Sequence, residues 1–253
     1  MYPILFQWNQ WILPTWHVMF VLAAFCGYFY MQRLRKAAAP EISARTLDSL
    51  FVIVYVAGFI GARLFSFFTD EPLYEPHVQV PLWHILLPGP MTFYGGALAG
   101  FGAGLWFCLW NKVSKASLLD CVIPAVLLAL FIGRIGCFLN GDDFGLPVPI
   151  HPGEPVPWFA VTFPNHPVPI PRYPVQLFES GASLLLVFVC IACRKRNLPK
   201  GWTGILGLMG YAVARFFLEY LRGDPRGWVI DQVLSPAQLV SILIFVIGLA
   251  RLF

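Results

Sequence analysis

Charge is scarce in this chain. Asp, Glu, Lys and Arg make up 12% of its 253 residues, whereas hydrophobic residues make up 58%. The mean hydropathy of +0.70 lies well outside the usual range of soluble globular domains. This scarcity excludes an ordinary soluble domain and indicates a membrane protein with no nucleic-acid partner.

Positive charge is also missing from the start of the chain, where "MYPILFQWNQW" precedes the first apolar run without a Lys or Arg. A cleavable signal peptide carries positive charge there, so we expect the first run to be a retained span. The six cysteines all fall in or at the ends of apolar runs, which argues against a disulfide framework. One C-x-x-C, "CIAC" at 190–193, has no second pair, so we expect no metal and no cofactor.

Long apolar runs take the place of the missing charge. A bilayer core about 30 Å thick needs roughly 20 mostly apolar residues per helix. Runs of this kind lie at about 12–30, 49–68, 93–110, 118–139, 175–193, 203–221 and 235–253. The sequence therefore predicts an all-α, polytopic membrane protein, with seven transmembrane helices in a single domain over residues 1–253.

The loops between these runs differ in charge. Lys and Arg gather in alternate loops and at the end of the chain, at Arg33, Arg35, Lys36, Arg45, Lys112, Lys115, Arg194, Lys195, Arg196, Lys200 and Arg251. The other loops hold Arg172, Arg222 and Arg226 and most of the acidic residues. Because positive loops stay in the cytoplasm, we expect the N-terminus outside and the C-terminus inside.

A few ionisable residues fall inside the predicted spans, namely Arg63, Arg134, Arg215, Glu179 and Glu219. The predicted orientation places all of them in the outer half of the membrane. Each costs about 2.5 to 3.5 kcal/mol at mid-bilayer and less near the interface. One interpretation is that the arginines reach up to the headgroups and the glutamates pair with them. However, Arg215, Glu219 and Arg222 are spaced to share one helix face, which favours a cavity.

A phosphate-bearing lipid is the ligand that such arginines suit, because guanidinium groups bind phosphate through paired hydrogen bonds. At the start of another span, "FYGGALAG" (93–100) places Gly95 and Gly96 where a lipid, or simply a neighbouring helix, can approach closely. The segment 139–174 is rich in proline and therefore favours stiff, extended chain. We expect it to form a small rim on the outer face.

The stretch "GRIGCFLNGDDFG" (133–145) resembles the signature of the prolipoprotein diacylglyceryl transferases of bacterial inner membranes. That signature reads Gly-Arg, any residue, Gly or Ala, Asn-Phe, an aliphatic or aromatic residue, Asn, any residue, Glu, any two, Gly. The chain follows it at Gly133, Arg134, Gly136, Phe138, Asn140 and Gly145. It departs at Cys137, where the family has Asn, and at Asp142, where the family has Glu. Further stretches resemble the family in the same order: "PTWHVMFVLA", "GARLF", "FYGG", "PVQLFES", "RFFLEYLRGDPRG" and "LSPAQLVSI".

The resemblance implies a transferase. Family members move the diacylglyceryl group of phosphatidylglycerol onto the lipobox cysteine thiol of a preprolipoprotein, forming a thioether and releasing glycerol phosphate. The implied partners are phosphatidylglycerol, the signal peptide of a preprolipoprotein and the lipid bilayer. The implied location is the bacterial cytoplasmic (inner) membrane, with the site toward the outer leaflet.

The resemblance also assigns roles to residues. Arg134 and Arg215 match the family's essential arginines and would hold the departing phosphate. Glu179 and Glu219 would orient these arginines, while Asn140 and Asp142 would hold the mouth of the site together. The remaining candidates for substrate binding are Arg63, Gly95, Gly96, Gly145 and Arg222.

The base that activates the substrate thiol is less clear from the sequence. The thiol has a pKa of about 8.5, so a base or a positive field is needed at neutral pH. Many relatives have a histidine where this chain has Tyr94. With a pKa of about 10, tyrosine suits hydrogen-bond donation better than base catalysis. His17, near the outer end of the first span, is a second candidate base, the alternative being a structural or interfacial role.

Two other functions fit parts of the pattern. A divergent family member that binds anionic lipid, with lost or altered transfer, fits the departures at Tyr94, Cys137 and Asp142. A transporter of small anions or protons would also carry buried charges, but on both sides of the membrane midplane. The inner halves of the predicted spans are nearly uncharged, with Asp120 at the edge, which favours an enzyme.

Overall fold

The computed structural model describes residues 2–9, 11–69, 92–164, 168–196, 198–223, 230 and 233–252. The chain divides into two compact units. The larger unit comprises residues 1–39 and 116–253, and the smaller unit comprises residues 40–115. The expected single domain over residues 1–253 stays a prediction.

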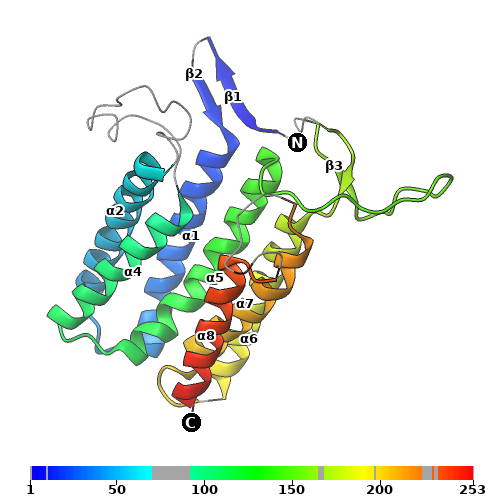
Figure 1. The fold of residues 1–253 in the computed structure, drawn as a ribbon. Coiled ribbons are helices and arrows are strands. Elements are labelled where there is room, and N and C mark those ends of the chain that lie inside the picture. Colours follow the sequence, from blue (N-terminus) through cyan, green and yellow to red (C-terminus); the bar gives the residue numbers. More distant parts are fainter. Residues whose placement is uncertain are drawn as a thin grey trace. The chain divides into compact units, whose positions relative to one another are not determined.

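Each predicted span contains one helix (Figure 1). Among the described residues the helices are α1 (Thr15–Ala38), α2 (Ala44–Thr69), α4 (Phe93–Trp110), α5 (Lys115–Asn140), α6 (Val175–Lys195), α7 (Trp202–Leu218) and α8 (Pro236–Leu252). Within the described residues, four helical stretches are long and apolar enough to cross a membrane: α2, α5, α6, and α7 with the 3-10 turn η2 (Glu219–Leu221) that follows it. The all-α class is thereby confirmed, and the number of spans stays a prediction.

The first helix begins later than the apolar run suggests. Residues 12–14 belong instead to an antiparallel hairpin of β1 (Ile4–Trp8) and β2 (Trp11–Pro14). Pro14 has an extended backbone, with φ −67° and ψ 138°, so the helix begins only at Thr15. The Thr15 hydroxyl donates to the carbonyl of Tyr2, and the Tyr2 N–H donates to the Leu139 carbonyl at 3.1 Å. These bonds fix the hairpin to the end of α5.

The core of the larger unit lies where α5 meets its neighbours. Leu127 of α5 packs with Val187 and Cys190 of α6, and all three side chains are buried. On another side of α5, Gly27 of α1 lies so close that an added Cβ would be 3.2 Å from the Cβ of Ala129. Close packing around α5 therefore gives the ends of the neighbouring helices fixed positions.

A buried carboxylate sets the position of α7 against α5. Asp120 of α5 accepts hydrogen bonds from the backbone N–H groups of Gly201, at 2.6 Å, and Gly204, at 2.8 Å. Gly201 has a φ of +91°, which glycine adopts at no steric cost. Because the first N–H groups of a helix lack internal partners, the Asp120 carboxylate caps α7. It therefore fixes how far α7 extends along α5.

In the smaller unit, α2 and α4 pack through glycines. An added Cβ on Gly61 would lie 2.3 Å from the Cβ of Ala99, and one on Gly95 would lie 2.3 Å from the Cβ of Phe65. Gly96 is similarly close, its added Cβ being 3.0 Å from the carbonyl oxygen of Gly58. Helix packing accounts for both glycines of "FYGG", and their expected contact with substrate stays a prediction.

Candidate active site

The signature stretch 133–145 ends α5 and turns into a loop. The N–H groups of Gly141 and Asp142 both donate to the carbonyl of Cys137, at 2.9 and 3.3 Å, which closes the last turn of the helix. Gly141 and Asp143 have positive φ angles of 85° and 57°. Aspartate is one of the few residues that tolerate this conformation, so the chain reverses direction here without a second glycine.

Gly145 is the point where three chain segments meet. Its N–H donates to the carbonyl of Tyr173, just before α6, at 3.0 Å, and the next N–H, that of Leu146, donates to the carbonyl of Leu221 after α7 at 2.8 Å. An added Cβ on Gly145 would lie 2.4 Å from the Tyr173 oxygen and 2.8 Å from the Leu221 oxygen. Only glycine fits this position, which holds the signature loop against the ends of α6 and α7.

Arg134 lies at the centre of the charged cluster. Its Nε is 3.0 Å from Oε2 of Glu179 on α6, and its Nη1 is 2.5 Å from Oδ2 of Asp143 in the loop. The side chain of Glu179 is 1% exposed, whereas that of Asp143 is 26% exposed. The end of α5, the loop after it and the beginning of α6 therefore bring a cation and its two partners together.

Arg222 and Tyr211 complete the network. The Arg222 Nη2 pairs with Oδ1 of Asp143, and its Nη1 lies 3.9 Å from Oε2 of Glu179. The Tyr211 hydroxyl of α7 donates to Oε1 of Glu179 at 2.6 Å. Glu179 thus receives charge or hydrogen bonds from α5, α7 and the segment after α7, and it connects all three.

The expected common helix face of Arg215, Glu219 and Arg222 is only partly correct. Arg215 Nη1 and Glu219 Oε2 do form a pair, at 2.6 Å. However, α7 ends at Leu218, the next turn is 3-10, and Arg222 is extended, with ψ 140°. Its backbone forms an isolated bridge with Gly145. Arg222 therefore lies beside the signature loop in extended chain, paired with Gly145, and not on the helix face of Arg215. The helix ends before the "GDP" that follows Arg222 in the sequence.

Arg215 retains hydrogen-bonding capacity. The side chains of Arg215 and Glu219 are 10% and 9% exposed. Although the two charges are close, Arg215 Nη1 has no aligned hydrogen-bond acceptor within the described part of the chain. A largely buried guanidinium has five N–H donors, more than one carboxylate accepts, and is therefore suited to bind an anionic ligand as well.

Asp142 supports the loop from the side. Its Oδ2 accepts a hydrogen bond from Asn140 Nδ2 at 2.7 Å, and its backbone carbonyl accepts one from Gln176 Nε2 of α6 at 2.5 Å. Burial is the main reason why the pKa of Asp142 is raised above its ordinary value. Gln176 is fully buried, and sequence analysis did not identify it.

The proline-rich segment folds back onto the signature loop. It contains two short antiparallel strands, β3 (Val161–Thr162) and β4 (Pro171–Arg172). Arg172 is buried; its Nη1 donates to the carbonyl of Gly145 at 3.2 Å, and its guanidinium lies 4.9 Å from the ring centre of Phe144. From residue 141 on, the described part of this segment contains short strands and turns and no helix, and Arg172 attaches it to the site.

The cluster also gathers potential metal ligands. Cys137 Sγ and carboxylate oxygens of Asp142 and Asp143 lie within 4.8 Å of one another. Asp143, however, already pairs with Arg134 and Arg222, whose positive charges disfavour a metal cation at the same place. The expectation of a metal-free site stays a prediction.

The remaining candidates belong to α1, α2 and α4. His17 is exposed on α1, and its ring contacts the edge of Trp16, with ring centres 5.1 Å apart. Arg63 is buried on α2, and Tyr94 is 39% exposed on α4, both in the smaller unit. Their expected roles stay predictions.

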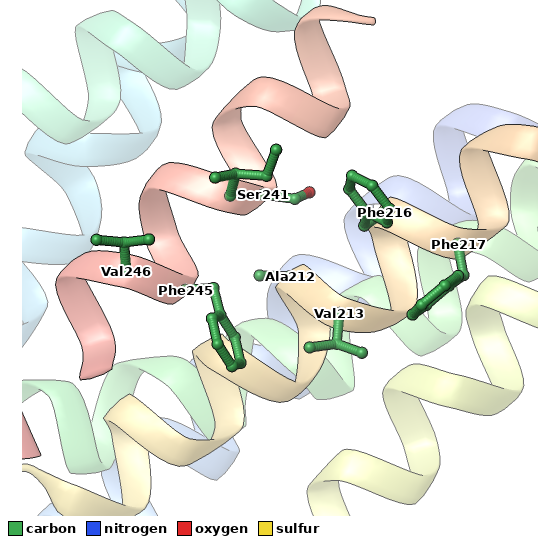
Figure 2. A pocket seen from close by; sticks show the side chains of 8 residues that line it. Ala212, Val213, Phe216, Phe217, Ser241, Phe245 and Val246 are labelled. Atoms are coloured by element: carbon green, nitrogen blue, oxygen red, sulfur yellow. The ribbon is translucent and has the colours of Figure 1, made fainter. Parts of the chain in front are cut away.

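An apolar groove runs between α7 and α8, formed by residues within 212–217 and 241–246 (Figure 2). It encloses about 190 Å³. The Ser241 hydroxyl in its lining already donates to the carbonyl of Ala237 at 2.8 Å. The groove offers apolar surface and no cation, so the chemistry for binding an anion is found in the arginine cluster.

Comparisons with known proteins show the family of the chain. The family model described as prolipoprotein diacylglyceryl transferase matches residues 3–253. A phosphatidylglycerol–prolipoprotein diacylglyceryl transferase of Azospirillum brasilense is 31% identical, over 87% of this chain and 81% of the relative. Proteins of the same name from Idiomarina loihiensis (32% identical; 98% and 90% covered) and Rhodospirillum rubrum (30% identical; 97% and 92% covered) are similar throughout. The chain belongs to the prolipoprotein diacylglyceryl transferase family.

Proposed function

We propose that this protein transfers the diacylglyceryl group of phosphatidylglycerol to the lipobox cysteine thiol of a preprolipoprotein. The observation that carries the proposal is the buried cluster of Arg134, Arg222 and Glu179, with Arg215 one helix turn beyond Tyr211. The names of the similar proteins specify the lipid and the protein substrate.

The proposed reaction explains why arginines are needed. The thiolate sulfur attacks the glycerol carbon that carries the phosphate ester; a C–S bond forms and the C–O bond breaks. The electron pair of that bond leaves with glycerol phosphate, whose negative charge grows by one unit as the phosphate diester becomes a monoester. The thiol proton passes to a base. Guanidinium groups that bind this phosphate more strongly as its charge grows lower the barrier.

We assign the roles accordingly. Arg134 and Arg215 bind the phosphate, and Glu179 and Glu219 orient them through the pairs described above. Arg222 and Asn140 line the mouth of the site. In the proposed roles, Tyr94 donates a hydrogen bond to substrate, Arg63 adds positive charge, and Gly95 and Gly96 contact the lipid.

Asp142 and Gly145 keep the signature loop in place, through the bonds from Gln176 and to Tyr173. His17 is the candidate base for the thiol proton. The Tyr94→Phe and His17→Ala variants test these two assignments: loss of the hydroxyl should reduce transfer, and loss of the imidazole should shift the pH–rate profile. Wild-type rates and profiles in both variants would remove Tyr94 and His17 from the mechanism.

The charge pattern of the loops supports a defined orientation. We propose that all seven helices cross the bacterial inner membrane, with the N-terminus in the periplasm, the C-terminus in the cytoplasm and the arginine cluster at the outer leaflet. Trp158, 95% exposed in the proline-rich segment, and Arg196, exposed after α6, should then lie on opposite sides. In intact cells an impermeant thiol reagent should label Trp158→Cys but not Arg196→Cys; the reverse pattern would overturn the orientation.

Transfer is tested directly with purified protein, phosphatidylglycerol and a lipobox peptide, by following the mass gain of the peptide. Arg134→Ala and Arg215→Ala should each abolish the gain, whereas Arg33→Ala, at an exposed position on α1, should retain it. Absence of transfer by the wild type, under conditions where another family member is active, would refute the transferase.

A lipid-binding protein without transfer is the second candidate, favoured by Cys137, Asp142 and Tyr94 at positions where the signature or its relatives have other residues. It predicts that the wild type binds phosphatidylglycerol and never modifies the peptide. The same assay therefore separates the two functions.

A further inference from the structure

Asp143 lies between two guanidinium groups. Its Oδ2 is 2.5 Å from Arg134 Nη1, and its Oδ1 pairs with Arg222 Nη2. Two oxygens of one anion thus each receive a different arginine. A phosphate group has the same ability, since its oxygens accept charge-assisted hydrogen bonds from several guanidiniums at once.

Within the four residues of these ion pairs, positive and negative charges are equal in number. Arg134 and Arg222 contribute two positive charges, while Asp143 and Glu179 contribute two negative charges. A phosphate that joined them would add uncompensated negative charge to a largely buried site, which is unfavourable. Binding of a phosphate is therefore favoured if one of the two carboxylates moves away from the arginines.

Asp143 is the carboxylate that is able to leave. Its side chain is 26% exposed, whereas that of Glu179 is 1% exposed and also holds the Tyr211 hydroxyl. Asp143 lies at the apex of a short loop that is fixed at Cys137 on one side and at Gly145 on the other. Both anchors are backbone hydrogen bonds, so neither depends on the Asp143 side chain.

We propose that Asp143 occupies the place of the substrate phosphate in the empty site, and that an arriving phosphate displaces it from Arg134 and Arg222. The inference rests on the proposed function, which assigns the phosphate to Arg134 and places Arg222 at the mouth of the same site. The family signature leaves position 143 open, so this exchange is a property of this chain. The displacing ligand is a phosphate anion, either in a lipid headgroup or in the released glycerol phosphate.

The exchange makes a quantitative prediction. If the carboxylate holds the arginines in about nine of ten empty molecules, the apparent affinity for phosphate is reduced about tenfold. Asp143→Ala and the isosteric Asp143→Asn should therefore bind glycerol phosphate about tenfold more tightly than the wild type. A carboxylate that serves to hold the arginines in position would have the opposite effect when removed.

The experiment uses the full-length protein in nanodiscs of phosphatidylcholine. Calorimetry measures the affinity for glycerol phosphate, and steady-state transfer gives the KM for phosphatidylglycerol. Glu154→Gln, which removes one exposed negative charge from the proline-rich segment, is the matched control and should leave both values unchanged. Thermal unfolding of each variant verifies that it is folded.

The outcomes are distinct. Tighter binding of glycerol phosphate together with a lower KM supports exchange with the headgroup phosphate; tighter binding of glycerol phosphate alone supports exchange with the product. Unchanged or weaker binding in both folded Asp143 variants overturns the exchange, while the transferase stands if the wild type is active. If the wild type neither binds glycerol phosphate nor modifies the peptide, both the exchange and the proposed function fail.

Discussion

Glu179 should be the most sensitive position of the charged cluster. It is almost fully buried and contacts Arg134, Arg222 and Tyr211. Glu179→Ala leaves Arg222, whose side chain is 2% exposed, with one charged partner fewer. Removing one partner of a buried ion pair costs about 3–5 kcal/mol. For a chain of this size, each kcal/mol lowers the unfolding midpoint by about 2–4 °C. We therefore expect a decrease of roughly 6–20 °C.

Glu179→Gln separates charge from hydrogen bonding. The amide oxygen still accepts from the Tyr211 hydroxyl, but the charge opposite the arginines is lost. We expect a decrease in the midpoint smaller than that of the alanine variant. Tyr211→Phe should cost about 1.5–3 kcal/mol in the wild type, since its hydroxyl bonds to a charged group, and much less in the Glu179→Ala background.

The unfolding midpoint of each purified variant is measured by tryptophan fluorescence during heating. Transfer of diacylglyceryl to a lipobox peptide is measured separately. Glu154→Gln, at an exposed position, serves as the control and should leave the midpoint unchanged. A midpoint for Glu179→Ala within about 2 °C of the wild type would show that the buried arginines do not depend on this carboxylate, and would refute the reasoning.

Three further predictions concern the supports of the site. Gly145→Ala should abolish transfer and lower the unfolding midpoint, because its Cβ would meet two backbone oxygens. Gly181→Ala, with nothing within 4 Å of the added Cβ, should change neither property. Wild-type transfer and an unchanged midpoint in Gly145→Ala would contradict the packing described at this position. Asp120→Ala should cost about 1–3 kcal/mol, since two buried N–H groups at the start of α7 lose their acceptor, and amide exchange at Gly201 and Gly204 should rise; unchanged exchange there would argue against the cap. The raised pKa of Asp142 favours its protonated form in the folded protein, so stability should fall as pH rises from the ordinary value of 3.8 through the raised one. Asp142→Asn should remove this fall in unfolding midpoints measured from acidic to neutral pH, and a persistent slope would assign it to another group.

The helices could be predicted from the sequence because the length of an apolar run is a strong signal. The boundaries were less accurate where local chemistry overrides hydrophobicity. Residues 12–14 are apolar yet belong to a strand, since the backbone of Pro14 is extended and the helix begins only at the next residue. At the other end of the chain, α7 changes to a 3-10 turn before Arg222. The helical spacing that places Arg222 on one face with Arg215 and Glu219 applies only as far as the helix continues, and the helix ends before Arg222.

The site could be predicted in part. Arg134, Glu179 and Arg215 could be selected as candidates because a charged side chain inside an apolar run has a high free-energy cost and is usually functional. Their partners were harder to identify. Tyr211 lies one turn before Arg215, and Gln176 lies one turn before Glu179, so both share a face with an identified residue. Helical spacing was therefore a usable signal for these two.

The position of Asp143 carried no comparable signal. It follows Asp142 directly, and the sequence alone does not decide which of the two faces the arginines. The turn decides this: Gly141 and Asp143 adopt positive φ angles, which directs the Asp143 carboxylate to Arg134 and Arg222. Backbone conformation in a loop depends on the anchors at both ends, and the Gly145 anchor involves residues far away in the sequence.

The two departures from the family signature fall at positions where this chain provides other contacts. Asp142 is one methylene shorter than the glutamate of the signature, yet Asn140 and Gln176 hold its carboxylate and its carbonyl. Cys137 replaces an asparagine, and its carbonyl still closes the helix by accepting two N–H groups, a function that does not depend on the side chain. The loop therefore keeps its anchors despite both substitutions. Because Arg134 pairs with Glu179 and Asp143, and neither residue stands at a position where this chain departs from the signature, the two departures leave the ion pairs of Arg134 in place.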